Sequence, residues 1–154
     1  MRVFGEADKK KKAGRIKIPA NPAGLSDETL SQLADLVKAA LREGSLPCGS
    51  AFKIARDAAV PRLAVGDVTD RLGIRISNCQ IGCFKVDKII NDSPGTETVD
   101  EMVLARLEGL KGDDALTCPN VFALAGELSM TPMAVAQVAN ARNMKVHSCQ
   151  LGCF

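Results

Sequence analysis

The chain has little of what most enzyme active sites are built from. Its 154 residues include one histidine, no tryptophan and no tyrosine, and they contain neither a glycine-rich phosphate loop nor a nucleophile elbow. Acid–base, phosphoryl-transfer and acyl-transfer sites need such groups at recognisable spacing. We therefore expect that the chain is not an enzyme, with Lewis-acid chemistry at an open metal ion as the one route left.

Long hydrophobic runs are missing as well. No stretch approaches the roughly 18 consecutive apolar residues of a membrane span. The start, MRVFGEADKKKKAGRIKIP, has no apolar segment after its charges, as a secretory signal would have. These absences predict a cytoplasmic protein with no membrane partner. In that compartment the six cysteines are expected to be thiols or metal ligands rather than disulfides.

Aromatic residues make up only 3% of the chain, although 46% of it is hydrophobic. Its core must therefore consist mainly of alanine, valine, leucine, isoleucine and methionine. This composition favours small, helix-rich units.

What the chain does contain is an internal duplication. A shift of 70 residues superposes Leu46–Phe84 on Leu116–Phe154 without a gap, with 12 identities in 39 positions. All three cysteines of each copy are among the identities. A gapless match of this kind indicates two tandem copies of one unit.

The duplication sets the expected domains. Residues 29–84 form the first repeat and residues 99–154 the second, joined by a linker at 85–98 that contains Asp, Ser, Pro and Gly. Residues 1–28, with seven Lys and Arg against four Asp and Glu, predict a basic arm.

Each repeat predicts three helices and a strand. A stripe of apolar residues at helical spacing, centred on Leu33 and Val37 or on Val103 and Leu107, predicts the first helix. A second helix is expected to start just after the first cysteine, with Pro119 as the first helical residue in the second copy, and to run to about Ala58 or Leu128. In the second copy Thr131-Pro132 predicts the start of the third. The alternation around Ile74–Ile76 and Met144–Val146 then predicts a strand.

Helix, helix, tight turn, helix and β-wing is the order of a winged helix-turn-helix domain. The chain resembles that superfamily through FKIARDAAVPRLAVGDVTDRL and FALAGELSMTPMAVAQVANAR. The resemblance implies a mainly α fold with small β-wings, of the α+β class, in two tandem winged-helix repeats.

The cysteines follow one spacing, Cys-x30-Cys-x3-Cys, in both copies. Cysteines four apart on an extended chain lie roughly 13 Å from each other, whereas two sulfurs on one zinc are at most about 4.6 Å apart. The chain must therefore curl between them, and glycine in CQIGC and CQLGC can adopt the positive φ that a curl requires. The predicted metal ligands are Cys48, Cys79, Cys83, Cys118, Cys149 and Cys153.

Three soft ligands per repeat suit an iron–sulfur cluster or zinc. Zinc needs a fourth ligand, and only the second copy has a nearby histidine, His147, where the first has Ser77. One 4Fe-4S cluster per repeat is therefore the first interpretation and zinc the alternative. The plainer interpretation is that the cysteines are small buried core residues.

A helix-turn-helix unit also suggests double-stranded DNA as a partner, through side chains near the third helix. The candidates are Arg62, Arg71, Arg75, Gln137, Asn140, Arg142 and Lys145, with Asp67 and Asp70 opposing the first set. Residues 30–84 hold seven Lys and Arg against five Asp and Glu, but residues 100–154 hold four against six. A broad basic face for phosphates is therefore not expected.

Two functions remain open at this point. The first is a redox- or cluster-responsive DNA-binding transcriptional regulator. The second is an electron-transfer or cluster-carrying subunit of a larger redox enzyme complex, in which the winged-helix units serve as scaffold. The oligomeric state does not follow from the sequence.

Overall fold

The chain divides into two structural units, each containing the helices of one copy. The computed structural model describes residues 19–83, 96–110 and 116–153. Unit 1 contains residues 19–79 together with 150–153, and unit 2 contains the described residues from 80 to 149. Of the predicted arm, 1–28, and the predicted linker, 85–98, residues 1–18 and 85–95 lie outside the described residues.

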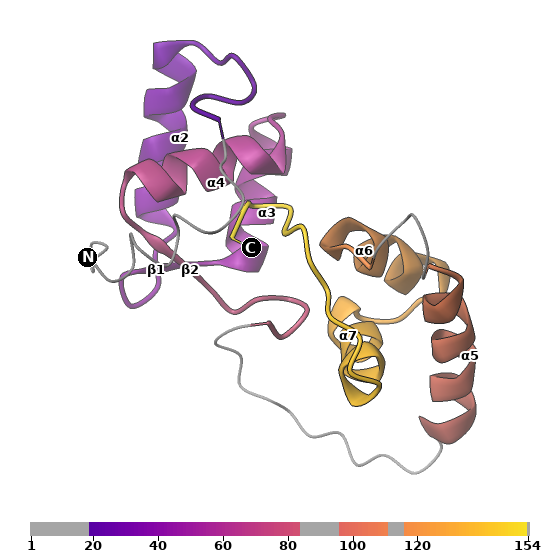
Figure 1. Ribbon diagram of the computed structural model, residues 1–154. Helices are drawn as coiled ribbons and strands as arrows, with labels where there is room; N and C mark the ends of the chain where they lie inside the picture. Colours follow the sequence, from indigo (N-terminus) through magenta and orange to yellow (C-terminus); the bar gives the residue numbers. More distant parts are fainter. Residues whose placement is uncertain (1–18, 84–95, 111–115, 154) are drawn as a thin grey trace. The chain divides into compact units, whose positions relative to one another are not determined.

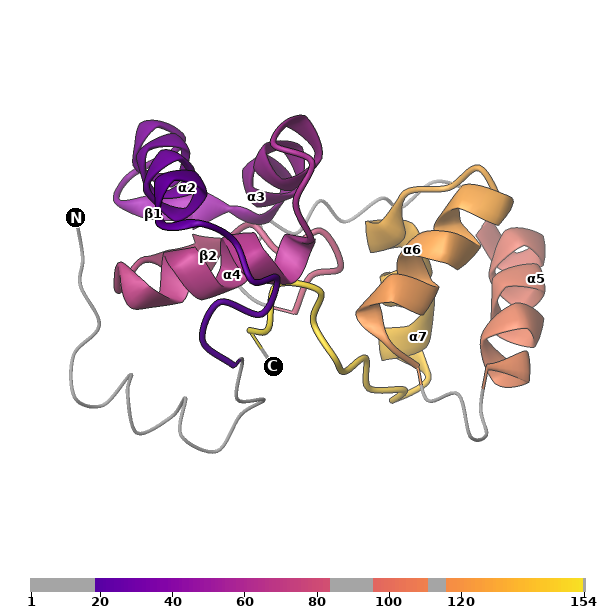
Figure 2. The ribbon, with the colours of Figure 1, turned by 90° about the horizontal axis from the view of Figure 1, so that it is seen from above.

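The described residues of unit 1 form three helices and two short strands (Figure 1). They are α2 (Asp27–Ala39), β1 (Ser45–Pro47), α3 (Cys48–Asp57), α4 (Arg62–Arg71) and β2 (Arg75–Ser77). Helix α2 begins after Ser26, whose hydroxyl oxygen accepts a hydrogen bond from the Thr29 backbone N–H at 3.2 Å. Helices α2 and α3 both pack against α4 (Figure 2), and apart from Cys48 their buried side chains are aliphatic, as the low aromatic content predicts.

Unit 2 contains α5 (Thr96–Gly109), α6 (Cys118–Glu127) and α7 (Pro132–Ala141), with α7 packed against both other helices. The side chain of Thr131 accepts a hydrogen bond from the Ala134 backbone N–H at 3.2 Å and caps α7, which confirms the predicted start. Thr117 caps α6 in the same way. Pro119 is the second helical residue rather than the first, because α6 begins at Cys118 itself.

The two copies repeat one another in backbone conformation. Four turns have positive φ at positions 70 residues apart: Ala59 (54°) and Ser129 (52°), Gly73 (66°) and Asn143 (55°), Asn78 (49°) and Ser148 (56°), and Gly82 (73°) and Gly152 (71°). Non-glycine residues in this region are strained, so their recurrence reflects a shared chain path. The duplication inferred from sequence is therefore also a duplication of structure.

The second and third helices of each copy are joined by a sharp turn. In unit 2 the bend between α6 and α7 is 115°, within the roughly 90–120° of helix-turn-helix pairs. The described helices include none that is long and apolar enough to cross a membrane singly; α6 and α7 meet that test only when taken together across their bend.

The strand predicted after the third helix exists in unit 1 as β2. It pairs in parallel with β1, with Leu46 opposite Ile76 and Pro47 opposite Ser77. Unit 2 has the same connection as a single parallel bridge between Thr117 and His147. The mainly helical α+β class is confirmed, and the described strands form a parallel pair instead of the antiparallel hairpin that a wing implies.

Gly66, in α4, provides a test of how closely the C-terminal segment packs on unit 1. A Cβ added at Gly66 would lie 2.1 Å from the backbone oxygen of Leu151, whereas one added at Gly126, in α6, would have nothing within 4 Å. Alanine favours a helix over glycine by about 0.5–1 kcal/mol. We therefore expect Gly126→Ala to raise the free energy of unfolding by about that amount and Gly66→Ala to lower it, as measured by urea denaturation. Equal stabilisation by both substitutions would contradict the contact.

Candidate metal centres

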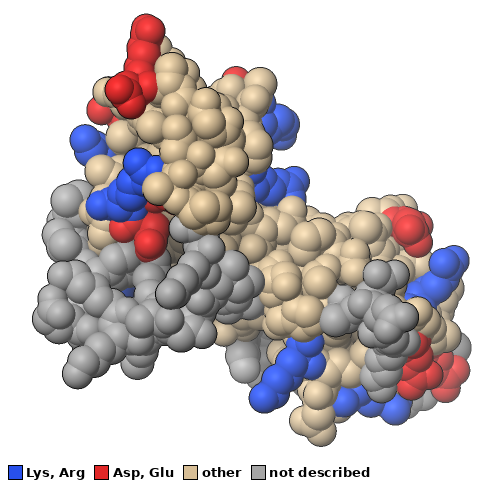
Figure 3. Space-filling view, turned by 45° about the horizontal axis from the view of Figure 1, so that its top comes forward, with Lys and Arg blue, Asp and Glu red and all other residues tan. Residues whose placement is uncertain are grey.

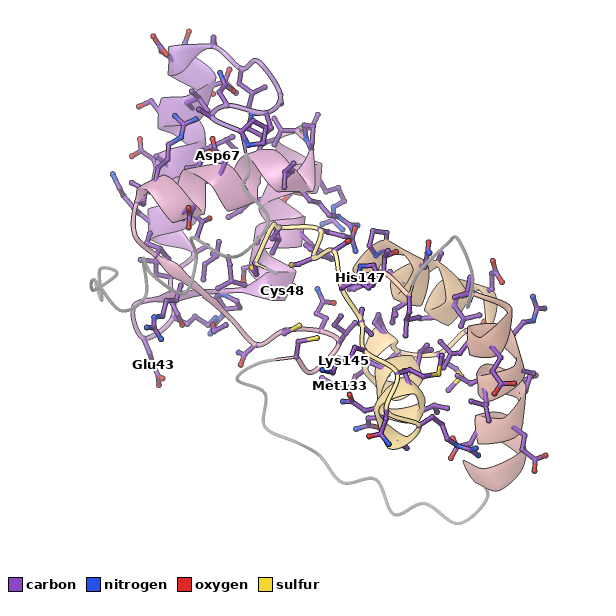
Figure 4. All side chains as sticks on the ribbon, viewed as in Figure 1. Glu43, Cys48, Asp67, Met133, Lys145 and His147 are labelled. Atoms are coloured by element: carbon purple, nitrogen blue, oxygen red, sulfur yellow. The ribbon has the colours of Figure 1, made fainter. Side chains whose placement is uncertain are left out.

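The first cysteine of each copy is the first residue of a helix. Cys48 begins α3 and Cys118 begins α6, and both are buried, at 6% and 4% exposure. Figure 4 labels Cys48 at this end of α3. The backbone N–H groups and the dipole of a helix N-terminus favour a thiolate over a thiol. Both copies therefore place a cysteine at the N-terminus of a helix.

The second cysteine of each copy lies at the same end of the unit because of the parallel pairing. Pro47, next to Cys48, is opposite Ser77, which is two residues before Cys79. In unit 2 the Cys118 backbone N–H donates to the His147 carbonyl at 2.9 Å, two residues before Cys149. Each unit thus brings together two cysteines that are 31 positions apart in sequence.

The third cysteine follows a turn in both tails. We call Gln80–Cys83 the first tail and Gln150–Cys153 the second tail. Gly82 and Gly152 have φ of 73° and 71°, which confirms that the chain curls at these glycines. The aliphatic residue before each glycine, Ile81 or Leu151, is buried. The tails are therefore packed segments, held by one apolar side chain each.

All six cysteines are thiols in the structure. Within residues 19–83, 96–110 and 116–153, no three Cys, His, Asp or Glu side chains are arranged to hold one metal ion. Cys79 is buried, Cys149 and Cys153 are half-buried, and Cys83 is exposed. The donor chemistry fits an iron–sulfur cluster, with two ligands of each centre juxtaposed by the backbone and the third on a turned tail.

The asymmetry between Ser77 and His147 persists in the structure. The Ser77 hydroxyl is buried and accepts a hydrogen bond from the Ser45 hydroxyl at 2.9 Å. His147 is exposed, with Nδ1 3.0 Å from the Ser148 hydroxyl oxygen. Unit 2 thus offers a histidine as the fourth ligand that zinc needs beside three cysteines, and unit 1 has a serine at that position.

The DNA-contact candidates of unit 1 are engaged within the protein. Arg71 forms a two-pronged ion pair with Asp67, at 3.2 Å from Nε and 2.6 Å from Nη2. The Arg62 guanidinium lies 3.9 Å from the centre of the Phe52 ring and donates a hydrogen bond to the Gln150 side chain. Arg75 is half-buried in β2. Arg62 and Arg71 thus make contacts within unit 1, although both residues are exposed.

The candidates of unit 2 are all exposed. Gln137 and Asn140 are one helical turn apart on α7, and Arg142 and Lys145 follow that helix. In the view of Figure 3, basic and acidic side chains lie in small separate groups. The exposed end of α7 is thus the best-formed nucleic-acid candidate among the described residues, and it is small.

Comparisons with protein-family models, curated proteins and solved structures give no match for this chain. The function is therefore inferred from the cysteines and the helix pairs of the chain itself.

Sequence reasoning treated Asp67 as a carboxylate opposing DNA, but it is a buried structural residue. Its side chain accepts hydrogen bonds from Arg71 and from the Asn21 backbone N–H at 3.2 Å, and the residue is 5% exposed. Asp67 therefore ties α4 to the turn that precedes α2. An aspartate four residues before an arginine on one helix was the available signal for the ion pair.

Asp67→Asn removes the charge that holds Arg71. We expect it to lower the free energy of unfolding by about 1–3 kcal/mol, because a buried charge-assisted hydrogen bond is lost. Asp35→Asn is the matched control, since Asp35 pairs with Lys38 at 3.9 Å on an exposed surface and should change stability by less than about 1 kcal/mol. Urea denaturation measures both, and equal effects would contradict the role assigned to Asp67.

Proposed function

We propose that this chain binds iron–sulfur clusters through its six cysteines and acts as a cluster-responsive, DNA-binding regulator of the tandem winged-helix type. One observation carries the proposal. In both copies a cysteine begins a helix, and the backbone beside it pairs with the segment that leads to the second cysteine. A buried thiol at a helix N-terminus, with a second thiol two residues beyond the paired backbone, occurs in both copies and favours a ligand role over packing alone.

The chemistry of the donors supports a cluster over zinc. A 4Fe-4S cluster held by three cysteines leaves one iron for another or an exchangeable ligand, and this arrangement is available to both units. The clusters would supply sensitivity to oxidants and to iron supply. Zinc in a closed site needs a fourth protein ligand, for which unit 1 has no histidine.

The connection between the cysteines and the third helix supports a regulatory role. Only Leu72, Gly73 and Ile74 separate α4 from β2, and β2 ends two residues before Cys79. Residues 142–148 join α7 to Cys149 in the same way. Ligation of these cysteines therefore restrains the segment directly after each third helix. In the proposed mechanism, release of the cysteines allows that helix to change its orientation on DNA.

DNA contact is assigned to unit 2 in this proposal. Gln137 and Asn140 have the groups that pair with adenine edges, and Arg142 and Lys145 suit guanine or phosphate. All four side chains are exposed. Unit 1 contributes less, because Arg62 and Arg71 are held by Phe52 and Asp67.

A second candidate function is an electron-transfer or cluster-carrying subunit of a larger redox enzyme complex. The internal engagement of Arg62 and Arg71 favours it, as does the excess of six acidic over four basic residues in 100–154. In this case the helix pairs are scaffold, and DNA binding is absent.

The first test is anaerobic purification with iron, sulfide and zinc measured per chain, together with a visible absorption spectrum. We expect iron and sulfide in about equal amounts in the wild type. A chain with Cys79→Ala and Cys149→Ala should lose both, because each unit loses a ligand. Zinc without sulfide would indicate structural zinc sites instead of clusters. A wild type without metal would indicate that the cysteines are core residues and not ligands.

The second test separates the two functions through the salt dependence of DNA binding. Arg142→Ala should weaken binding by the cluster-loaded protein and reduce the slope of log K against log salt by about 1. Arg106→Ala is the matched control, because Arg106 is equally cationic and exposed but lies on α5. Equal DNA affinity of the cluster-loaded and metal-free protein, or no DNA binding at low salt, would contradict the regulator function. The electron-transfer or cluster-carrying subunit would then be the candidate that is left.

A further inference from the structure

The second tail belongs to unit 1, although it ends the second copy in sequence. Residues 150–153 cluster with residues 19–79, and both ribbon views draw this segment next to α4 (Figures 1 and 2). Leu151 is 2% exposed, and its backbone passes so close to Gly66 that no larger residue fits there without displacement. The tail is thus packed directly on α4.

A polar contact anchors the same tail. Arg62, in the first turn of α4, donates a hydrogen bond to the Gln150 side chain while its guanidinium lies over the Phe52 ring of α3. Arg62 therefore connects three parts of unit 1. Leu151 supplies the apolar anchor and Gln150 the polar one, and Cys153 follows two residues later.

The first tail is grouped with unit 2, although it follows the helices of unit 1 in sequence. Gln80 is the first residue of unit 2, so Gln80–Cys83 is grouped with the second copy although it ends the first. Ile81, the equivalent of Leu151, is 3% exposed. Each tail is therefore assigned to the unit that contains the other copy's helices.

This assignment divides each Cys-x3-Cys motif between the units. Unit 1 contains Cys48, Cys79 and Cys153, and unit 2 contains Cys118, Cys149 and Cys83. The sequence alone groups Cys79 with Cys83 because they are four residues apart. The bounds of the two units instead group each tail cysteine with the first two cysteines of the other copy.

We propose that the two centres exchange their third ligand. Cys153 completes the centre of Cys48 and Cys79, and Cys83 completes the centre of Cys118 and Cys149. The proposal rests on the iron–sulfur function above and adds which thiolates share a cluster. Metal binding closes the tail cysteine onto the pair that the parallel backbone connection already holds. Neither repeat then contains a complete centre of its own.

Two double variants of the full chain distinguish the exchanged from the unexchanged centres. Cys48→Ser with Cys153→Ser removes two ligands from one proposed centre, so about half of the wild-type iron and sulfide should remain. Cys48→Ser with Cys83→Ser removes one ligand from each centre, so nearly all should be lost. Both variants remove one helix-start cysteine and one tail cysteine, which makes them matched controls for each other. Circular dichroism verifies that both remain folded.

If each centre drew its ligands from a single copy, the Cys48→Ser, Cys83→Ser variant would keep about half of the iron and sulfide, and the Cys48→Ser, Cys153→Ser variant would lose nearly all of it. That result would overturn the exchange. Equal loss in the two variants would overturn it as well, since it indicates one shared site. A wild type without iron or sulfide is a different failure. It would refute the proposed iron–sulfur function. The question of which thiols lie together would then be answered by a measurement that needs no metal.

That measurement is disulfide formation in chains that keep two cysteines, with the other four changed to serine. One chain keeps Cys48 and Cys153, and the other keeps Cys118 and Cys153. Diamide takes two electrons and two protons from a pair of neighbouring thiols and leaves an S–S bond. We expect a Cys48–Cys153 disulfide by peptide mass mapping, formed at least ten times faster than a Cys118–Cys153 disulfide. The reverse preference would overturn the assignment of the second tail to unit 1.

Discussion

A short parallel backbone pairing is the interaction on which the rest of each unit depends. It joins the residues just before the second helix to those just after the third, so both helices lie within the loop that it closes. Parallel strands require a long crossover, usually helical, and here α3 and α4 form it between β1 and β2. The same pairing brings together two cysteines that the sequence separates by 31 positions. The parallel pairing thus both closes the loop that contains the two helices and brings the two cysteines to one end of the unit.

The helix pairs place the candidate nucleic-acid face and the cysteines on one continuous stretch of chain. The segment that leaves each third helix turns at Gly73 or Asn143, both with positive φ, and leads directly to the second cysteine. The second cysteine of each copy is therefore connected to the end of that helix by a short segment. The copies have diverged around this common plan: unit 1 uses Asp67, Arg71 and Arg62 to hold its own elements. The corresponding residues of unit 2, Pro132, Gln137 and Ala141, carry no charge.

Several elements followed from the sequence because their causes are local. Thr131 and Pro132 specify a helix start by capping and by a missing N–H, and α7 begins there. The stripe of Leu33 and Val37 specifies the buried face of α2, and both residues are buried. Gly82 and Gly152 take the positive φ expected of them. In contrast, the partner of the strand after α4 was not predictable, because a three-residue strand has no periodicity that identifies β1 as its neighbour.

By itself, the sequence determined that the chain is duplicated, that each copy is mainly helical, and that each copy carries three cysteines, the last two on either side of a glycine. These properties depend on residue identity and on spacing along the chain. The strand predicted at Met144–Val146 is absent, because unit 2 pairs only through the single bridge at His147. Only the tertiary structure decided that Asp67 is a buried ion-pair partner and that the second tail packs on unit 1 through Leu151 and Gln150. Both depend on side chains and backbone from distant positions meeting in space, and a spacing pattern within one copy carries no information about such contacts.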